Sequence, residues 1–304
     1  MRIAISGSSG LIGNALKGSL TADEHEVVTL VRRAAGPGEI GWNPDTGTLD
    51  AAALEGFDAI VNLNGAPIAG RRWSAAYKKV LLASRTNATR TLAETIKRLD
   101  DPPRVFVSAS AIDYYGLGRG SDVLDEDEPA GTDFLARLVD YWEEAASPAV
   151  HAGVAVVYPR FGNVISARGG PLAAMLPRFR LGLGGPIAGG WHYWSAVSVV
   201  DATRALRFLI DTLGCTGSYN VTAPEPVTQG EFVRTLADEL HRPALLPVPA
   251  LALQIRYGEL VEYIVASRRV LPRRLVEAGF EFDHPDTRSI IKAALRNPMT
   301  AKTE

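Results

Sequence analysis

A glycine-rich segment near the N-terminus constrains the fold of this chain more than any other feature. The sequence Gly7-Ser8-Ser9-Gly10-Leu11-Ile12-Gly13 follows a predicted strand at residues 2–6 and opens a predicted helix at residues 11–20. In that setting Gly7 permits a tight turn, Gly10 lets a ligand approach the backbone, and Gly13 lets the helix pack close to the strand. The segment therefore predicts a diphosphate-binding turn at the N-terminus of a helix, with a tight turn that binds nothing as the alternative.

The first 160 residues alternate between short strand-like runs and longer helical patterns. Strands are predicted at residues 2–6, 26–31, 59–63, 104–108 and 154–160, and helices at residues 11–20, 74–99 and 132–146. Strands that alternate with helices of this length indicate right-handed crossover units and a parallel sheet. We therefore expect an α/β fold of the Rossmann type, with a doubly wound parallel sheet.

The pattern changes after about residue 165. Glycine and proline at residues 169–171 and 182–186 predict loops, followed by a strand at residues 218–221 and helices at residues 229–240 and 250–265. This part is short and interrupted, which favours a small α/β lobe over an independent domain. We expect a Rossmann-type domain at residues 1–165, a small C-terminal lobe intertwined with it at residues 166–296, and a tail at residues 297–304.

Composition excludes several classes of function. The 304 residues carry a formal net charge of −2, so no global excess of basic residues predicts a nucleic-acid partner. The single cysteine, Cys215, excludes an internal disulfide and a cysteine-based zinc cluster, and the five histidines lack metal-ligand spacing, so no metal is expected. No apolar run approaches the roughly 18–20 residues of a membrane span, and no signal peptide precedes the first strand. We expect no membrane partner and a cytoplasmic location.

The end of the second predicted strand indicates which dinucleotide binds. Arg32 and Arg33 follow that strand, where dinucleotide folds selective for NAD carry an acidic residue that binds the ribose 2′-hydroxyl. A guanidinium makes bidentate contacts with phosphate and stacks on adenine. Arg32 therefore favours NADP over NAD, with a solvated pair of surface arginines as the alternative.

Several further segments resemble one protein family over residues 2–296. They are the glycine turn, Asn62-Leu63-Asn64-Gly65-Ala66, Arg72-Trp73, Ser84-Arg85, Ser108-Ala109-Ser110, Tyr114-Tyr115-Gly116, Trp142-Glu143-Glu144, Met175-Leu176-Pro177, residues 179–186, Gly217–Val221 and residues 270–275. Together they resemble the extended short-chain dehydrogenase/reductases, and within them the nucleoside-diphosphate-sugar epimerase-like proteins. The resemblance implies a bound nicotinamide dinucleotide and a small substrate lobe.

The resemblance also implies where the cofactor binds. The expected cofactor-binding residues are Gly7, Ser8, Ser9, Gly10, Leu11, Ile12, Arg32, Leu63, Asn64, Gly65, Arg85 and Ser108. Arg72 and Trp73 offer a cation and a stacking face to an anionic substrate, and Met175 and Trp194 lie in segments expected to line its pocket. These four are the predicted substrate-binding residues.

The expected catalytic residues are Ser110 and Tyr115. Ser110 matches the position of the superfamily's catalytic serine, and Tyr114 and Tyr115 supply phenols nearby. A tyrosine with an ordinary pKa near 10 needs a neighbouring cation to act as a base, and Arg85, Arg119 and Arg160 are candidates. The alternative is that Tyr114-Tyr115-Gly116 only packs a loop over the cofactor.

One departure from the superfamily pattern leaves two functions open. The superfamily's Tyr base and the Lys four residues later are absent from the predicted helix at residues 132–146, where Phe134 is followed by Leu138 and Tyr141 by Ala145. The first function is an NADP-binding oxidoreductase or epimerase that transfers hydride between nicotinamide and a polar carbonyl or hydroxyl substrate, sugar-nucleotide-like or otherwise. The second is a non-catalytic NADPH sensor or partner protein. Neither the substrate, the reaction direction nor the oligomeric state is determined, a homodimer being one alternative.

Overall fold

The computed structural model describes residues 1–296 and divides them into two units. Unit 1 comprises residues 1–114, 134–160 and 203–219, and unit 2 comprises residues 115–133, 161–202 and the described residues from 220 onward. The units are thus interleaved along the chain. The expected boundary at residue 165 and the substrate role of the C-terminal lobe stay predictions, and the expected tail at 297–304 lies outside the described residues.

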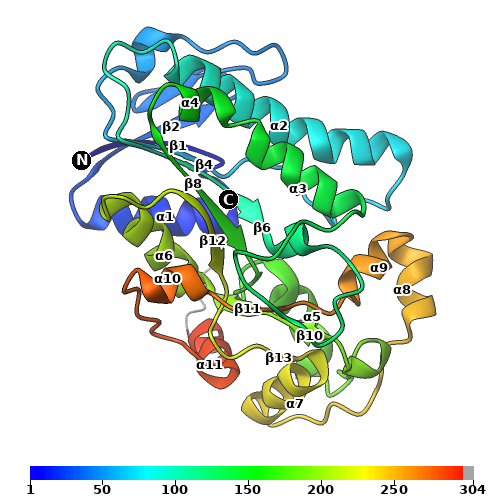
Figure 1. Cartoon of the computed structure of the whole chain (residues 1–304). Helices are drawn as coiled ribbons and strands as arrows, with labels where there is room; N and C mark the ends of the chain where they lie inside the picture. Colours follow the sequence, from blue (N-terminus) through cyan, green and yellow to red (C-terminus); the bar gives the residue numbers. More distant parts are fainter. Residues whose placement is uncertain (297–304) are drawn as a thin grey trace. The chain divides into compact units, whose positions relative to one another are not determined.

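A parallel sheet forms the centre of unit 1 (Figure 1). Its strands run in the order β12-β8-β5-β4-β1-β2-β3, with β6 beside β8. Their bounds are β1 Arg2–Ser6, β2 Glu26–Val31, β3 Glu39–Gly41, β4 Ala59–Asn62, β5 Val105–Ser108, β6 Ser110–Ala111, β8 Ala155–Phe161 and β12 Gly217–Val221. The pairs β1–β2, β1–β4, β4–β5 and β5–β8 are all parallel. This confirms the predicted Rossmann-type α/β fold, and β3 is a strand that the sequence pattern did not predict.

Helices cover both faces of this sheet. They are α1 Leu11–Ala22, α2 Ala75–Ile96, α3 Phe134–Glu144, α4 Ser147–His151 and the part of α6 (Val199–Asp211) that belongs to unit 1, with the short 3-10 helices η1 Ala51–Leu54 and η2 Ile112–Tyr115. In Figure 1, α2, α3 and α4 lie over one face and α1 over the other. Ser74 caps α2 by accepting a hydrogen bond from the Tyr77 amide at 3.1 Å, as its position in the sequence predicts.

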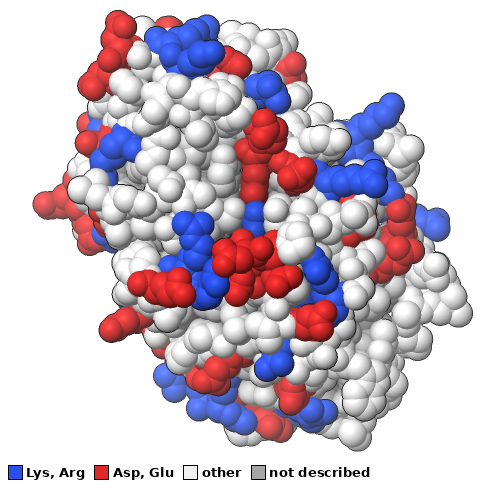
Figure 2. All heavy atoms as spheres, in the orientation of Figure 1, with Lys and Arg blue, Asp and Glu red and all other residues white. Residues whose placement is uncertain are grey.

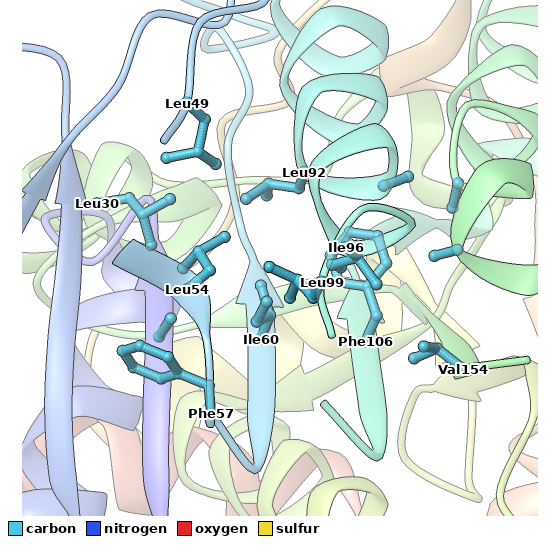
Figure 3. Close-up of a cluster of buried hydrophobic side chains, with 14 of the residues drawn as sticks. Leu30, Leu49, Leu54, Phe57, Ile60, Leu92, Ile96, Leu99, Phe106 and Val154 are labelled. Carbon is cyan, nitrogen blue, oxygen red and sulfur yellow. The ribbon is translucent and has the colours of Figure 1, made fainter. Parts of the chain in front are cut away.

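The hydrophobic core of unit 1 lies between α2 and the strands. Figure 3 shows Leu92 and Ile96 of α2 together with Ile60 of β4 and Phe106 of β5. All four side chains are fully buried, which accounts for the near-continuous apolar runs of β4 and β5. The buried strands fix the sheet, and with it the edge at which their carboxyl ends meet.

Unit 2 contains short strands and several helices. Its elements are β7 Val123–Leu124, β9 Asn163–Ile165, α5 Gly170–Arg180, η3 Ala188–Gly190, β10 Tyr193–Trp194, β11 Ala196–Ser198, β13 Val227–Thr228, α7 Gln229–Leu240, α8 Ala250–Tyr257, α9 Leu260–Ile264, β14 Arg269–Val270, α10 Arg273–Glu277 and α11 Thr287–Arg296. Residues 115–133 group with this unit because β7 pairs in parallel with β14. The predicted small α/β lobe is confirmed as an architecture.

Two sequence predictions in unit 2 are wrong. The expected loop at residues 169–171 begins α5, because Gly169 is its N-cap and Pro171 stands in its first turn, where the missing N–H costs nothing. The single helix expected at residues 250–265 is two helices, since Gly258, with φ of 63°, ends α8 before α9 begins.

Two broader expectations concern charge and membranes. On the face seen in Figure 2, basic and acidic side chains are interspersed in small groups. Among residues 1–296, none of the helices combines the length and the apolar character needed to cross a membrane.

Candidate functional site: the carboxyl ends of the unit 1 strands

The turn between β1 and α1 requires glycine at two positions. Gly7 has φ of 73°, and a Cβ there would lie 2.6 Å from the Leu63 carbonyl oxygen. A Cβ on Gly13 would lie 2.3 Å from the Gly7 carbonyl oxygen and 2.8 Å from Cα of Ser8. The contacts are with backbone atoms, which cannot rotate away. These glycines therefore fix the shape of the turn.

The N-terminus of α1 lacks a cap from the protein itself. Gly10 is the N-cap residue and no side chain accepts a hydrogen bond from the first turn. The first helical bond runs from the Asn14 amide to the Gly10 carbonyl at 2.9 Å. The amides of Leu11, Ile12 and Gly13 have no acceptor within residues 1–296. Amide groups of this kind, together with the helix dipole, bind anions.

Gly10 differs from the other two glycines. A Cβ on Gly10 would approach only the Gly7 carbonyl oxygen, at 3.3 Å, so the protein's own atoms demand glycine there less strictly. A methyl group would stand at the mouth of the uncapped helix, where a diphosphate must approach the backbone. The residues present therefore fit the diphosphate of a dinucleotide.

The two arginines after β2 have different partners. Arg33 donates to both carboxylate oxygens of Glu39, at 2.7 and 2.6 Å, and this hydrogen bond lowers the pKa of Glu39. Arg32 is exposed, and its side chain makes no hydrogen bond or ion pair with any residue that the structure describes. Arg32 is therefore the guanidinium available to a ligand at this strand end, and its role in binding the cofactor stays a prediction.

A buried polar network that sequence reasoning missed supports the next strand end. Oδ1 of Asn62, at the end of β4, accepts hydrogen bonds from Ser6 Oγ at 2.8 Å and from the Asn64 side-chain amide at 3.1 Å. The Asn62 amide donates to Thr89 of α2 at 2.8 Å. Ser108 Oγ lies 3.5 Å from the Thr89 hydroxyl and is fully buried. The network fixes Asn64, one of the predicted cofactor-binding residues.

Arg85 supports the loop that follows β4. Its guanidinium donates to the carbonyls of Leu81 at 3.0 Å and Ala66 at 3.1 Å and lies 5.2 Å from the Trp142 ring centroid. A Cβ on Gly65 would lie 3.0 Å from its central carbon. Burial lowers the pKa of Arg85 to about 10. No carboxylate within the described residues forms an ion pair with this cation, although the charge of Asp113 partly opposes the effect of burial on it.

A second cluster surrounds Ser110, at the start of β6. The Ser110 hydroxyl donates to Oε1 of Glu143 on α3 at 2.5 Å. Arg160 of β8 donates to both oxygens of Glu143, each at 2.8 Å, and its guanidinium lies 3.4 Å from the Tyr114 ring centroid. Sequence reasoning named Ser110, Tyr114 and Arg160 but gave Glu143 no role; the sequence signal available was a carboxylate on the helix that lacks the Tyr/Lys pair.

Tyr115, the predicted catalytic phenol, has a different environment in unit 2. Its side chain is fully buried and its hydroxyl donates to Asn220 Oδ1 at 2.8 Å. The hydroxyl is therefore already engaged by an amide, and the catalytic role of Tyr115 stays a prediction. The tyrosine that lies beside a cation is Tyr114, which is only half-buried.

The four predicted substrate-binding residues are divided between the units. In unit 1, Arg72 is exposed, whereas Trp73 is buried, donates to the Ile68 carbonyl at 2.9 Å and packs edge-on against Phe134. In unit 2, Met175 packs against the core and Trp194 packs edge-on against Phe232 at 4.6 Å between ring centroids. Trp73 and Trp194 are therefore packing side chains, and the substrate roles of all four stay predictions. No group of three or more potential metal ligands occurs in residues 1–296.

Sequence comparisons identify relatives over nearly the whole chain. The model of the NAD dependent epimerase/dehydratase family matches residues 3–221, and a model described as a domain of unknown function matches residues 248–294. An epimerase family protein of Mycobacterium bovis is 42% identical over 284 residues, which cover 93% of each chain. The epimerase family protein SDR39U1 of Homo sapiens is 35% identical over 296 residues, covering 96% of this chain and 99% of that protein.

Solved structures agree with this result. The crystal structure of human epimerase family protein SDR39U1 with NADPH has a TM-score of 0.90 and 33% identity, covering 98% of this chain and all of that chain. A nucleoside-diphosphate sugar epimerase from Corynebacterium glutamicum has a TM-score of 0.81 and 30% identity, covering 97% of this chain and 58% of that one. The match of the family model over residues 3–221 and these relatives show that this chain belongs to the NAD dependent epimerase/dehydratase family.

Proposed function

We propose that the chain is an NADP-dependent oxidoreductase or epimerase of the extended short-chain dehydrogenase/reductase type. The observation that carries this proposal is the uncapped N-terminus of α1 behind Gly10, where the amides of Leu11, Ile12 and Gly13 fit a diphosphate. Family membership and the crystal structure of the human relative with NADPH support the same cofactor. The substrate class is a polar carbonyl or hydroxyl compound, for which a sugar nucleotide is the leading candidate.

Different residues of unit 1 bind different parts of the cofactor and the substrate. The α1 amides hold the diphosphate, Arg32 selects the 2′-phosphate, and Arg85 keeps the loop at Gly65 and Ala66 in place. When bound, the cofactor supplies hydride exchange at its nicotinamide carbon. Ser110 holds the substrate oxygen by a hydrogen bond. The protein thereby supplies placement and proton handling.

Removing Arg32 tests the choice of cofactor. We expect Arg32→Ala to weaken NADPH binding by about 1–3 kcal/mol, the scale of a charge-assisted contact, and to change NADH binding little. Arg33→Ala is the matched control, because Arg33 is already engaged by Glu39. Both affinities can be measured by nicotinamide fluorescence titration. Equal losses for NADPH and NADH would contradict the assignment.

A second candidate function follows from α3. This helix holds no tyrosine followed four residues later by a lysine, since Leu138 follows Phe134 and Ala145 follows Tyr141 at that spacing, so a non-catalytic NADPH sensor is the alternative. The two functions differ in whether a substrate is converted: an enzyme converts it and a sensor does not. UDP-glucose and UDP-glucuronic acid with NADP⁺, and cyclohexanone and phenanthrenequinone with NADPH, can be followed by cofactor fluorescence, with product analysis for epimerised sugars. Tight NADPH binding without turnover of any compound would favour the sensor.

We also propose a cytoplasmic location and a small molecule, not a macromolecule, as the main partner. The lone cysteine, Cys215, is buried and cannot form an internal disulfide, which suits a reducing compartment. A homodimer is the oligomeric state to test first, by size-exclusion chromatography with light scattering.

A further inference from the structure

We propose that Ser110 and Glu143, with Arg160 holding Glu143, handle the proton that accompanies hydride transfer, in place of the Tyr/Lys pair missing from α3. This inference rests on the proposed function and deepens it. Ser110 would touch the substrate oxygen, whereas Glu143 and Arg160 act through Ser110. The three residues come from β6, α3 and β8 of unit 1.

The direction of the Ser110–Glu143 hydrogen bond determines what Ser110 offers a substrate. A carboxylate paired with a guanidinium only accepts, so the single hydrogen of Ser110 points to Oε1 of Glu143, 2.5 Å away. Ser110 Oγ then presents lone pairs, and the short charge-assisted bond increases its electron density. Such an oxygen accepts a proton from a substrate hydroxyl. While Glu143 is ionised and holds the Ser110 hydrogen, Ser110 does not donate to a substrate oxygen.

Arg160 fixes the acceptor in one orientation. Its Nε and Nη2 atoms each donate to one oxygen of Glu143 at 2.8 Å, a fork that sets the plane of the carboxylate. The Arg160 side chain is 4% exposed and that of Glu143 is 13% exposed. Tyr114 stacks on the guanidinium at 3.4 Å. Because a buried ion pair is a weak source of stability, its presence beside Ser110 favours a positioning role.

The other charged groups around Glu143 leave it as the acceptor. Tyr158 and Arg160 face it from β8, and Glu144 is its exposed neighbour on α3. Burial, reinforced by the charges of Glu143 and Glu144, raises the pKa of Tyr158 to about 12, so this phenol stays protonated at neutral pH. Tyr114 lies across the guanidinium of Arg160. Glu143 is therefore the carboxylate that receives the Ser110 hydrogen.

Protons and electrons balance when NADP is the second reactant. In the oxidation of an alcohol, the substrate C–H bond breaks and its hydride passes to NADP⁺, while the O–H bond breaks and its proton passes to Ser110 Oγ. The hydrogen of Ser110 moves to Oε1 of Glu143, which leaves a carbonyl product and NADPH. Glu143 then releases the proton to water. Carbonyl reduction is the reverse.

Variants separate this role from a structural one. Ser110→Ala leaves the Glu143–Arg160 pair intact, Glu143→Gln removes the charge, and Glu144→Gln is the matched control on the same helix. We expect the first two to lower kcat by about 100-fold or more, the usual contribution of proton transfer, with KM little changed. NADPH affinity should stay within about twofold in every variant.

Neutron diffraction of NADPH-loaded crystals tests the geometry without turnover. The deuterium of Ser110 should lie on the line to Glu143 Oε1, and a deuterium aimed elsewhere would overturn the proposal. So would wild-type turnover that survives both Ser110→Ala and Glu143→Gln. Turnover that depends on Ser110 but is unchanged in Glu143→Gln would remove Glu143 from the mechanism. If wild type binds NADPH but converts no compound of the panel, the proposed function fails and this inference fails with it.

Discussion

Substitution of Gly13 by alanine is expected to weaken NADPH binding by about 100-fold or more, corresponding to about 2.7 kcal/mol. The new methyl carbon would lie 2.3 Å from the Gly7 carbonyl oxygen and 2.8 Å from Cα of Ser8. Real side chains do not approach backbone this closely, so the turn must move away from α1. Moving it displaces the amides that are proposed to bind the diphosphate. Fluorescence titration with NADPH measures the loss, and circular dichroism checks that the sheet remains folded.

Gly18→Ala in the same helix is the matched control for this experiment. Nothing lies within 4 Å of a Cβ at Gly18, and glycine in a helix interior has an entropic cost. This variant should keep its NADPH affinity and gain about 0.5–1 kcal/mol in the free energy of unfolding. Wild-type NADPH affinity in Gly13→Ala would show that the dinucleotide binds elsewhere, and the proposed function would lose the observation on which it rests.

The first half of the fold could be predicted because its signals are local. The glycine turn, the apolar strands and the Ser74 cap each depend on residues a few positions apart, and each is found where the sequence places it. Arg32 could be chosen from its place after β2, although only the structure shows that Arg33 is engaged by Glu39. Local chemistry was therefore enough for the phosphate turn.

The proton-handling cluster could not be predicted because its members are far apart in sequence. Ser110 and Glu143 are separated by 33 positions, and Glu143 and Arg160 by 17. No helical or strand period connects them, and only the packing of α3 against β6 and β8 brings them together. Tyr115 illustrates the same limit, since its partner Asn220 is 105 positions away. Sequence alone could not distinguish this hydrogen-bonded phenol from its neighbour Tyr114.

The acidic run at residues 125–128 has partners that its composition does not reveal. A solvated loop is the ordinary expectation for such a run. In the structure, Glu126 accepts hydrogen bonds from the amides of Asn220 at 2.8 Å and Arg274 at 3.3 Å. Burial raises the pKa of Glu126. Asp125 and Asp127 pair with Arg273. These contacts join residues 125–127 to α10 within unit 2.

Asp201→Ala is expected to lower the free energy of unfolding by about 3–5 kcal/mol. It removes a buried carboxylate that accepts hydrogen bonds from a loop distant in sequence. Asp201 is fully buried in the first turn of α6. Its oxygens accept hydrogen bonds from the amides of Asp283 and His284, both at 2.9 Å, and from the Ser198 hydroxyl at 3.0 Å. Alanine would leave these amides without an acceptor. Urea unfolding followed by tryptophan fluorescence measures the change.

Two control variants distinguish this loss from that of an ordinary helix cap. The cap of α6 is Ser198, whose hydroxyl oxygen accepts a hydrogen bond from the Asp201 amide at 2.9 Å. Ser198→Ala should therefore cost about 1 kcal/mol, the usual value for an N-cap. The partly exposed His284 ring adds one contact to Asp201 at 3.1 Å, so His284→Ala should cost less than about 1 kcal/mol. If Asp201→Ala lowered the free energy of unfolding no more than Ser198→Ala, the loss of a helix cap would account for the whole effect. Asp201 would then not stabilise residues 283–284.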